Sequence, residues 1–213
     1  PLDAAGRSMQ LKAGKMATLM GVEAGEDVLN PNLDVASQDI FLEPFTETGA
    51  ELGVTLGAAL DVRLRVSNGW DQVTDVNTAK TVTTRLGVTP APDVLIALVA
   101  YTGPEQPGTN GPRRSGLDLV LSAKPGPTTT GWMQLDYGQE DSVGAGGGTA
   151  RWYAAGIWLT QEVSPWATLA LRGDYVNDRD GARTSGVLGF PSHAGQRLGS
   201  GTVTLNVRYW PPV

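Results

Sequence analysis

Charged side chains recur at every second position within several short apolar runs of this chain. Between Leu60 and Val66, for example, Asp61, Arg63 and Arg65 alternate with aliphatic residues. Because successive side chains of a β-strand point to opposite faces, such a run carries its charges on one face and its apolar residues on the other. Charges of both signs along one wet face can orient and filter charged solutes without any covalent step. The residues predicted to share this polar face are Lys12, Glu51, Asp61, Arg63, Arg65, Arg85, Asp118, Asp136, Arg172, Asp174 and Arg208.

Motifs for covalent or metal chemistry are weak by comparison. Ser192 and His193 are adjacent, but neighbours in sequence do not by themselves make a nucleophile and base with an orienting carboxylate. Residues 178–181 (Asp-Arg-Asp-Gly) resemble the start of a calcium loop, but no Glu follows at the matching spacing, so we favour an Asp/Gly turn. The Gly-rich run 144–148 precedes no helix and predicts no phosphate site. With one His and no Cys in the chain, we expect no enzyme, no cofactor and no metal centre.

Composition excludes further classes of protein. The formal net charge is −6 and no basic cluster is present, which argues against nucleic-acid binding. No run approaches about 18 consecutive apolar residues, so the sequence predicts no transmembrane helix. A β-barrel can still cross a membrane, because it needs apolar residues only at every second position.

The hairpin at residues 151–175 is the clearest element that would position the charges. Two alternating runs, 151–161 and 166–175, flank a turn that contains Ser164 and Pro165. Strands of about 9–11 residues can cross a membrane when tilted by about 45°. The same pattern predicts ten strands and no helix, over residues 9–16, 50–56, 60–67, 81–89, 94–102, 116–123, 132–139, 151–161, 166–175 and 202–210.

Connections between these predicted strands are alternately long and short. Short periplasmic turns at one end and long external loops at the other are typical of outer-membrane barrels. A sandwich or a soluble barrel gives no reason for this segregation. We therefore predict an all-β, antiparallel up-and-down transmembrane β-barrel, with residues 1–213 forming a single domain.

Tyrosines give a second indication of a membrane. Placed on the apolar face near strand ends, a tyrosine keeps its ring in an apolar environment and its hydroxyl in water. This placement sets Leu95, Ala97 and Val99 outward with Tyr101, although the run 94–102 is apolar on both faces. Four tryptophans fall instead on the polar face: Trp132, Trp158, Trp166 and Trp210. The predicted membrane-interface aromatics are Tyr101, Tyr137, Tyr153, Tyr175 and Tyr209.

Residues 21–45 form a long irregular connection between two predicted strands. Connections longer than about 12–15 residues are usually functional or mobile. One interpretation folds this segment into the barrel lumen as a constriction, and the other leaves it outside as a cap. In the first interpretation, the residues at the constriction are Glu23, Asp27, Asn30, Asn32 and Asp34.

Several short motifs, taken in order, resemble one known family. They are residues 11–21, 30–32, 43–49, 66–71, 80–90, 101–105, 178–184 and 205–211. In this order they resemble the beta-barrel porin-2 (OmpL-like) family of bacterial outer-membrane proteins over nearly the whole chain. Members of that family are longer, which implies that strands outside this chain complete the barrel. A barrel cut after ten strands would leave two bare edges in lipid, where each unpaired backbone group costs several kcal/mol.

The pattern and the resemblance together favour a porin in the bacterial cell outer membrane. We expect passive diffusion of small hydrophilic solutes or ions through a charged aqueous lumen, with outer-membrane lipid outside and no nucleic acid as a partner. The sequence is compatible with a homo-oligomer and with a complex with other envelope proteins. The alternative is a barrel that serves as a scaffold or sheath for a partner protein without a free pore. A soluble all-β binding domain is a third class, in which the Leu/Val face would be a closed core.

Overall fold

A computed structural model of the chain describes residues 6–25 and 29–208. Its main element is a single ten-stranded sheet in which neighbours in sequence are neighbours in space, and every pair is antiparallel. The predicted ten-stranded, antiparallel up-and-down all-β fold is confirmed. Asp27 and Tyr209, which the sequence assigned to the constriction and to the aromatic girdle, lie outside the described residues. The strands are β1 (Arg7–Ala17), β2 (Thr46–Leu56), β3 (Leu60–Trp70), β4 (Thr81–Ala91), β5 (Val94–Gly103), β6 (Arg114–Gly126), β7 (Thr129–Glu140), β8 (Ala150–Ser164), β9 (Ala167–Asp178) and β10 (Gln196–Val207).

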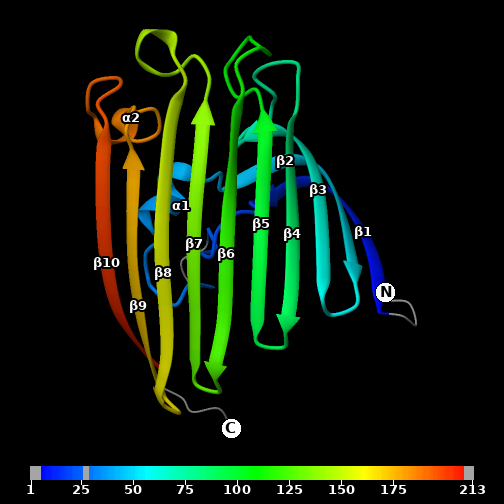
Figure 1. The fold of residues 1–213 in the computed structure, drawn as a ribbon, viewed down its shortest axis with the longest axis vertical. Coiled ribbons are helices and arrows are strands. Elements are labelled where there is room, and N and C mark those ends of the chain that lie inside the picture. Colours follow the sequence, from blue (N-terminus) through cyan, green and yellow to red (C-terminus); the bar gives the residue numbers. More distant parts are fainter. Residues whose placement is uncertain (1–5, 26–28, 209–213) are drawn as a thin grey trace.

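Loop length separates the two ends of the sheet. Short turns join β2 to β3, β4 to β5, β6 to β7 and β8 to β9 at the lower end in Figure 1. The longer connections, such as 71–80 and 104–113, gather at the opposite end. Short turns at one end and long loops at the other are the pattern of outer-membrane barrels.

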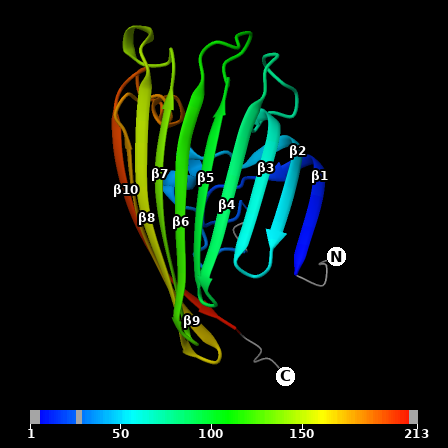
Figure 2. The same ribbon diagram turned by 45° about the vertical axis from the view of Figure 1, so that its right-hand side comes forward.

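The sheet is curved but does not close among the described residues. Strands β1 and β10 form its two edges, and neither pairs with a further described strand. Figures 1 and 2 show the sheet bent around the segment that joins β1 to β2, which lies against its concave face. We refer to the described residues of this segment, 18–25 and 29–45, as the inward loop.

The two faces of the sheet expose and bury the opposite kinds of side chain from those of a soluble protein. On the convex face large aliphatic side chains are exposed, and on the concave face many charged side chains are buried. A soluble sandwich would bury its aliphatic face, whereas a transmembrane barrel turns it to lipid. The exposed band includes Leu52, Leu64, Leu86, Leu98, Leu117 and Leu135.

Strand β5 does not follow the predicted orientation. Ala97 and Val99 are buried on the concave face, whereas Leu98 is 41% exposed on the convex face. The prediction that placed Ala97, Val99 and Tyr101 outward is therefore wrong. Alternation could not decide this strand because its concave side chains are also apolar, packing with Met20 of the inward loop and Trp70 of β3.

Short helices occur where the sequence predicted none. Helix α1 (Ser37–Leu42) lies in the inward loop, α2 (Ser185–Leu188) lies between β9 and β10, and a 3-10 turn, η2 (Ala145–Gly147), lies between β7 and β8. Such short pieces span too few turns to show a helical repeat in the sequence. In the part of the chain that the structure describes, no helix is long and apolar enough to span a membrane.

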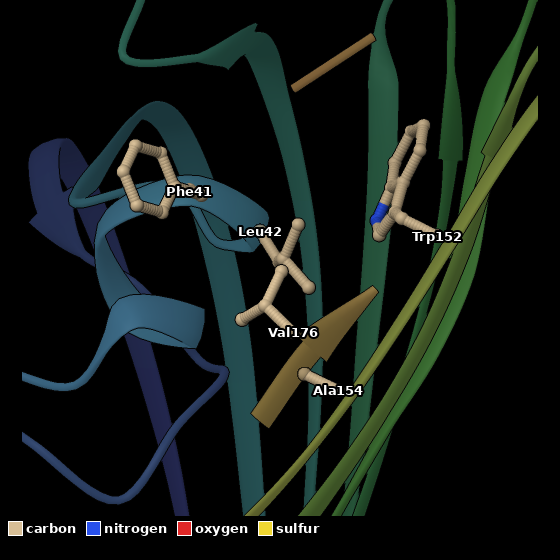
Figure 3. Packing of buried hydrophobic residues seen from close by; sticks show 5 residues of the cluster. All are labelled: Phe41, Leu42, Trp152, Ala154 and Val176. Carbon is tan, nitrogen blue, oxygen red and sulfur yellow. The ribbon is translucent and has the colours of Figure 1, made fainter. Parts of the chain in front are cut away.

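Helix α1 docks on the concave face through a small apolar cluster. Phe41 and Leu42 meet Trp152 and Ala154 of β8 and Val176 of β9 (Figure 3). This packing fixes the end of the inward loop beside the last strands of the sheet.

Room for the Trp152 ring comes from a glycine on the neighbouring strand. Gly138 of β7 lies directly opposite Trp152 in the register. A Cβ on Gly138 would overlap the indole ring, so only glycine allows the ring to lie flat against β7.

Candidate functional site: the concave face and the inward loop

The antiparallel register aligns the predicted polar residues in rows across the concave face. In one row Lys12 of β1 pairs with Glu51 of β2, which pairs with Arg65 of β3. In the next row Arg63 of β3 lies opposite Arg85 of β4. Further along that row, Asp118 of β6 lies opposite Asp136 of β7. The basic pair and the acidic pair thus lie on different strands of the same concave face, which forms the wall around the inward loop.

Arg65 is a buried structural cation. Its guanidinium donates to Glu51 at 3.0 and 2.5 Å, to Glu47 at 3.0 Å and to the carbonyl of Ala17 at 2.7 Å. Fully partnered in this way, Arg65 braces β1, β2 and β3. Sequence reasoning missed Glu47 because residues 46–49 are polar at both parities, so the predicted strand began only at residue 50.

Arg63 and Arg85 are partly exposed and share one carboxylate partner, Asp61. Arg63 contacts Asp61 and Glu51, both at 3.3 Å, and Arg85 also pairs with Asp61. Two like charges placed directly opposite on a sheet repel each other, and these two acids compensate that repulsion. Each guanidinium is still partly exposed and lines a cavity.

Arg172 of β9 is the main polar anchor of the inward loop. It donates to the Glu23 carboxylate at 3.1 Å, to the carbonyl of Asp34 at 2.6 Å and to the Asp34 carboxylate at 3.0 Å. Glu23 also accepts from the indole of Trp158 at 2.9 Å and from the amide of Ala36 at 2.6 Å. The inward loop is therefore tied to β8 and β9 by a buried charged network.

Other loop residues continue these contacts along β9 and β10. The Asn32 amide donates to Thr204 at 3.1 Å, and Asn206 donates to the carbonyl of Pro31 at 2.7 Å. The amide of Ser37 donates to Asp174 at 3.0 Å.

The predicted constriction residues thus occupy different environments. Glu23 and Asn32 are buried against the wall. Asn30 bonds within the loop, to both backbone groups of Ala24 at 2.8 Å. The Asp34 side chain is mostly exposed but reaches Arg172. The described residues of this segment lie against the concave face of the sheet.

A cavity of about 850 Å³ separates the inward loop from the first strands. Glu23 and Asp39 line it from the loop, and Arg63 and Arg85 line it from the wall. Carboxylates therefore lie on one side of the cavity and guanidinium groups on the other. Burial, with the nearby Glu23 charge, raises the pKa of the Asp39 carboxyl to about 7.

Arg208, the last of the predicted pore residues, has a different position. It follows the end of β10 and is exposed. Its backbone amide donates to the carbonyl of Trp166 at 2.8 Å, at the short-turn end of the sheet. It lies away from the cavity beside the inward loop.

The predicted interface tyrosines divide between the two faces. Tyr137, Tyr153 and Tyr175 are between 41% and 46% exposed on the convex face, near the long-loop end. The amide of Asn177 donates to the Tyr153 hydroxyl at 2.7 Å and to the Tyr175 hydroxyl at 3.4 Å. These three have the placement of an aromatic girdle.

Tyr101 is 4% exposed on the concave face, so its predicted place at the membrane interface is wrong. Its ring packs against Trp70, with 5.0 Å between ring centroids. The error follows from the orientation of β5, which is apolar on both faces.

An arginine and aromatic cluster at the long-loop end was not predicted from the sequence. The Arg114 guanidinium lies 4.7 Å from the Trp70 ring centroid, and that of Arg183 lies 5.1 Å from Trp70 and 5.6 Å from Trp152. Arg183 also donates to the carbonyl of Phe41 at 3.0 Å. It thereby connects the loop after β9 to β3, β8 and the inward loop. No local motif signals these contacts, because the residues come together only through the curvature of the sheet.

Comparison with protein families identifies the chain. A family model described as "putative beta-barrel porin-2, OmpL-like" matches residues 4–213. The chain belongs to this family. No curated protein and no solved structure matches this porin-2 family member. Membership agrees with the convex aliphatic band, the separation of long and short loops and the charged concave face.

Proposed function

We propose that this porin-2 family member is a passive diffusion channel of the bacterial outer membrane, for small hydrophilic solutes or ions. The cavity beside the inward loop carries the proposal. It is bordered by carboxylates on the loop and by guanidinium groups on β3 and β4. A solute passing between them would meet a transverse field that orients it, and transport would need no turnover and no cofactor.

The rest of the molecule supports a membrane setting for this cavity. The exposed aliphatic band on the convex face suits contact with lipid, and Tyr137, Tyr153 and Tyr175 suit one membrane interface. The inward loop would narrow the lumen and set the size limit for solutes.

The experiment is current recording from the full-length protein, folded in detergent and inserted into a planar bilayer. We expect stepwise conductance, and we expect Arg63→Glu and Arg85→Glu each to shift the reversal potential in a salt gradient toward greater cation preference. Lys124→Glu is the matched control, because it makes the same charge change at an exposed site by the short-turn end. An equal shift in Lys124→Glu, or no shift in either arginine variant, would refute the proposed path.

A scaffold or sheath without a free pore is the second candidate. It is favoured by the extent to which concave charges are already paired, as at Arg65 and Arg172. A correctly folded, heat-modifiable barrel that gives no conductance steps would favour this candidate over the channel.

A further inference from the structure

Three carboxylates from three separate elements meet on the concave face. Asp118 of β6 and Asp136 of β7 lie directly opposite each other, and Glu43 reaches them from the inward loop, just after α1. One carboxylate oxygen from each residue lies within 4.8 Å of the others. The residues are 0%, 5% and 3% exposed, respectively.

The charges of this acidic cluster are not balanced in the way that the charges of the basic pair, Arg63 and Arg85, are balanced. Arg63 and Arg85 are neutralised by Asp61 and Glu51. In the described part of the chain, by contrast, no Lys or Arg forms an ion pair with the acidic cluster. Buried charges without counter-charges cost several kcal/mol each, so these carboxyls either keep protons or face a bound cation.

The side-chain amide of Gln134 is inserted among the carboxylates. Its Nε2 lies 2.5 Å from Glu43 Oε1, 2.7 Å from Asp118 Oδ2 and 3.2 Å from Asp136 Oδ2. Its Oε1 accepts the backbone N–H of Val22 at 3.1 Å, which fixes the orientation of the amide. The amide has two hydrogens for three carboxylates, so it cannot give each of them a separate hydrogen bond.

The second oxygen of each carboxylate has no partner. Glu43 Oε2, Asp118 Oδ1 and Asp136 Oδ1 are buried without a hydrogen bond. Asp39 of α1 adds a further buried oxygen without a partner, Oδ2, and its charge acts on both Glu43 and Asp136. Oxygens so deeply buried without a partner either carry a proton or lie in place to bind a ligand that accepts lone pairs.

We propose that Glu43, Asp118 and Asp136 bind a calcium ion that fastens the inward loop to β6 and β7. The donors are all oxygen, with no His or Cys, which selects a hard cation. Ligands of one Ca²⁺ at about 2.3–2.6 Å lie no more than roughly 5 Å apart, as these oxygens do. Each carboxylate can coordinate a cation through one oxygen or through both. Three carboxylates therefore suit the variable coordination number of Ca²⁺ better than the strict octahedral geometry of Mg²⁺.

The site would link the loop to the side of the wall that Arg172 does not reach. Arg172 holds Glu23 and Asp34 against β9, whereas the calcium ion would hold Glu43 against β6 and β7. Gly21, whose backbone amide faces Asp118, passes directly over the Glu43 carboxylate, where a larger residue would not fit. This inference does not depend on whether the barrel conducts.

The test is calcium binding by the full-length protein, refolded in detergent without lipopolysaccharide and stripped with a chelator. Titration calorimetry with CaCl₂ at mildly alkaline pH should give one site per chain. Asp118→Asn and Glu43→Gln should each weaken binding by about tenfold or more, because each removes a charged ligand. Both replacements keep side-chain size and relieve repulsion, and heat-modifiable mobility on a gel checks that the variants are folded.

Asp75→Asn is the matched control, because Asp75 lies in the loop after β3 and pairs with Lys80 instead. It should bind calcium as the unmodified protein does. Calcium should also slow hydrogen exchange at the Val22 amide in the unmodified protein but not in Asp118→Asn. Absence of calcium uptake by the folded protein, or uptake that survives both Asp118→Asn and Glu43→Gln, would overturn the proposal.

Discussion

Replacing Arg172 tests how the inward loop is held. The side chain is 1% exposed and carries three hydrogen bonds to Glu23 and Asp34. Arg172→Met keeps most of the bulk but leaves Glu23 without its cation. Removing one partner of a buried ion pair costs about 3–5 kcal/mol. Because the loop can detach and return Glu23 to water while the sheet stays paired, we expect the loss in the docking of the loop rather than in the sheet.

Hydrogen exchange measures this docking directly. The amides of Ala36 and Ser37 donate to Glu23 and Asp174, so they exchange only when the loop opens. A loss of about 3–5 kcal/mol raises the opening equilibrium roughly 150- to 4,000-fold. Lys80→Met is the control, since the exposed pair of Lys80 with Asp75 is worth at most about 1 kcal/mol.

A second substitution separates the charge from the packing. Adding Glu23→Gln to Arg172→Met should recover part of the protection, because a neutral amide can still accept from Trp158 and Ala36. If Arg172→Met leaves the loop amides protected to within about tenfold, the charged network does not hold the loop. The apolar cluster around α1 would then be responsible.

Two further predictions concern the loop and the membrane face. The pKa of Asp39 is raised from 3.8 to about 7, so between these pH values the folded state holds a proton that the unfolded state has lost. Protection of the loop amides from hydrogen exchange should therefore fall as the pH rises from about 4 to 7. Asp39→Asn should remove much of this pH dependence. An unchanged pH profile in Asp39→Asn would contradict the assignment. On the convex face, Leu135→Arg in mid-strand should lower the free energy of unfolding from bilayers by about 2–4 kcal/mol, whereas Val163→Arg near the short turn should lower it by at most about 1 kcal/mol. Equal losses at the two positions in a reversible unfolding titration would place the lipid boundary elsewhere.

Strand number, order and most strand orientations could be predicted from the sequence because they are local properties. Alternation marked both faces of β3, where aliphatic residues separate Asp61, Arg63 and Arg65. The same rule failed at β5, where Val99 and Leu98 are equally apolar although one faces Trp70 and the other faces outward. Periodicity identifies a face only when the two faces differ in polarity.

The gathering of site residues could be predicted only in part. Asp118 and Asp136 were assigned correctly to one polar face of the sheet. Their meeting with Glu43 depends on where the inward loop docks, and the choice between lumen and cap could not be made from its composition. Arg183 likewise reaches Trp70 only because the sheet is curved.

The anchoring of the inward loop imposes an order on the assembly of the molecule. Glu23 finds Arg172 at a separation of 149 residues, and Pro31 finds Asn206 at a separation of 175. These partners belong to the last two described strands, so the loop cannot reach its final position before β9 and β10 are in place. If hairpins add in sequence, the wall is built first around an unfilled interior, and the entropy of closing the longest loops is lost at the end. A segment that follows the first described strand is then the last to settle.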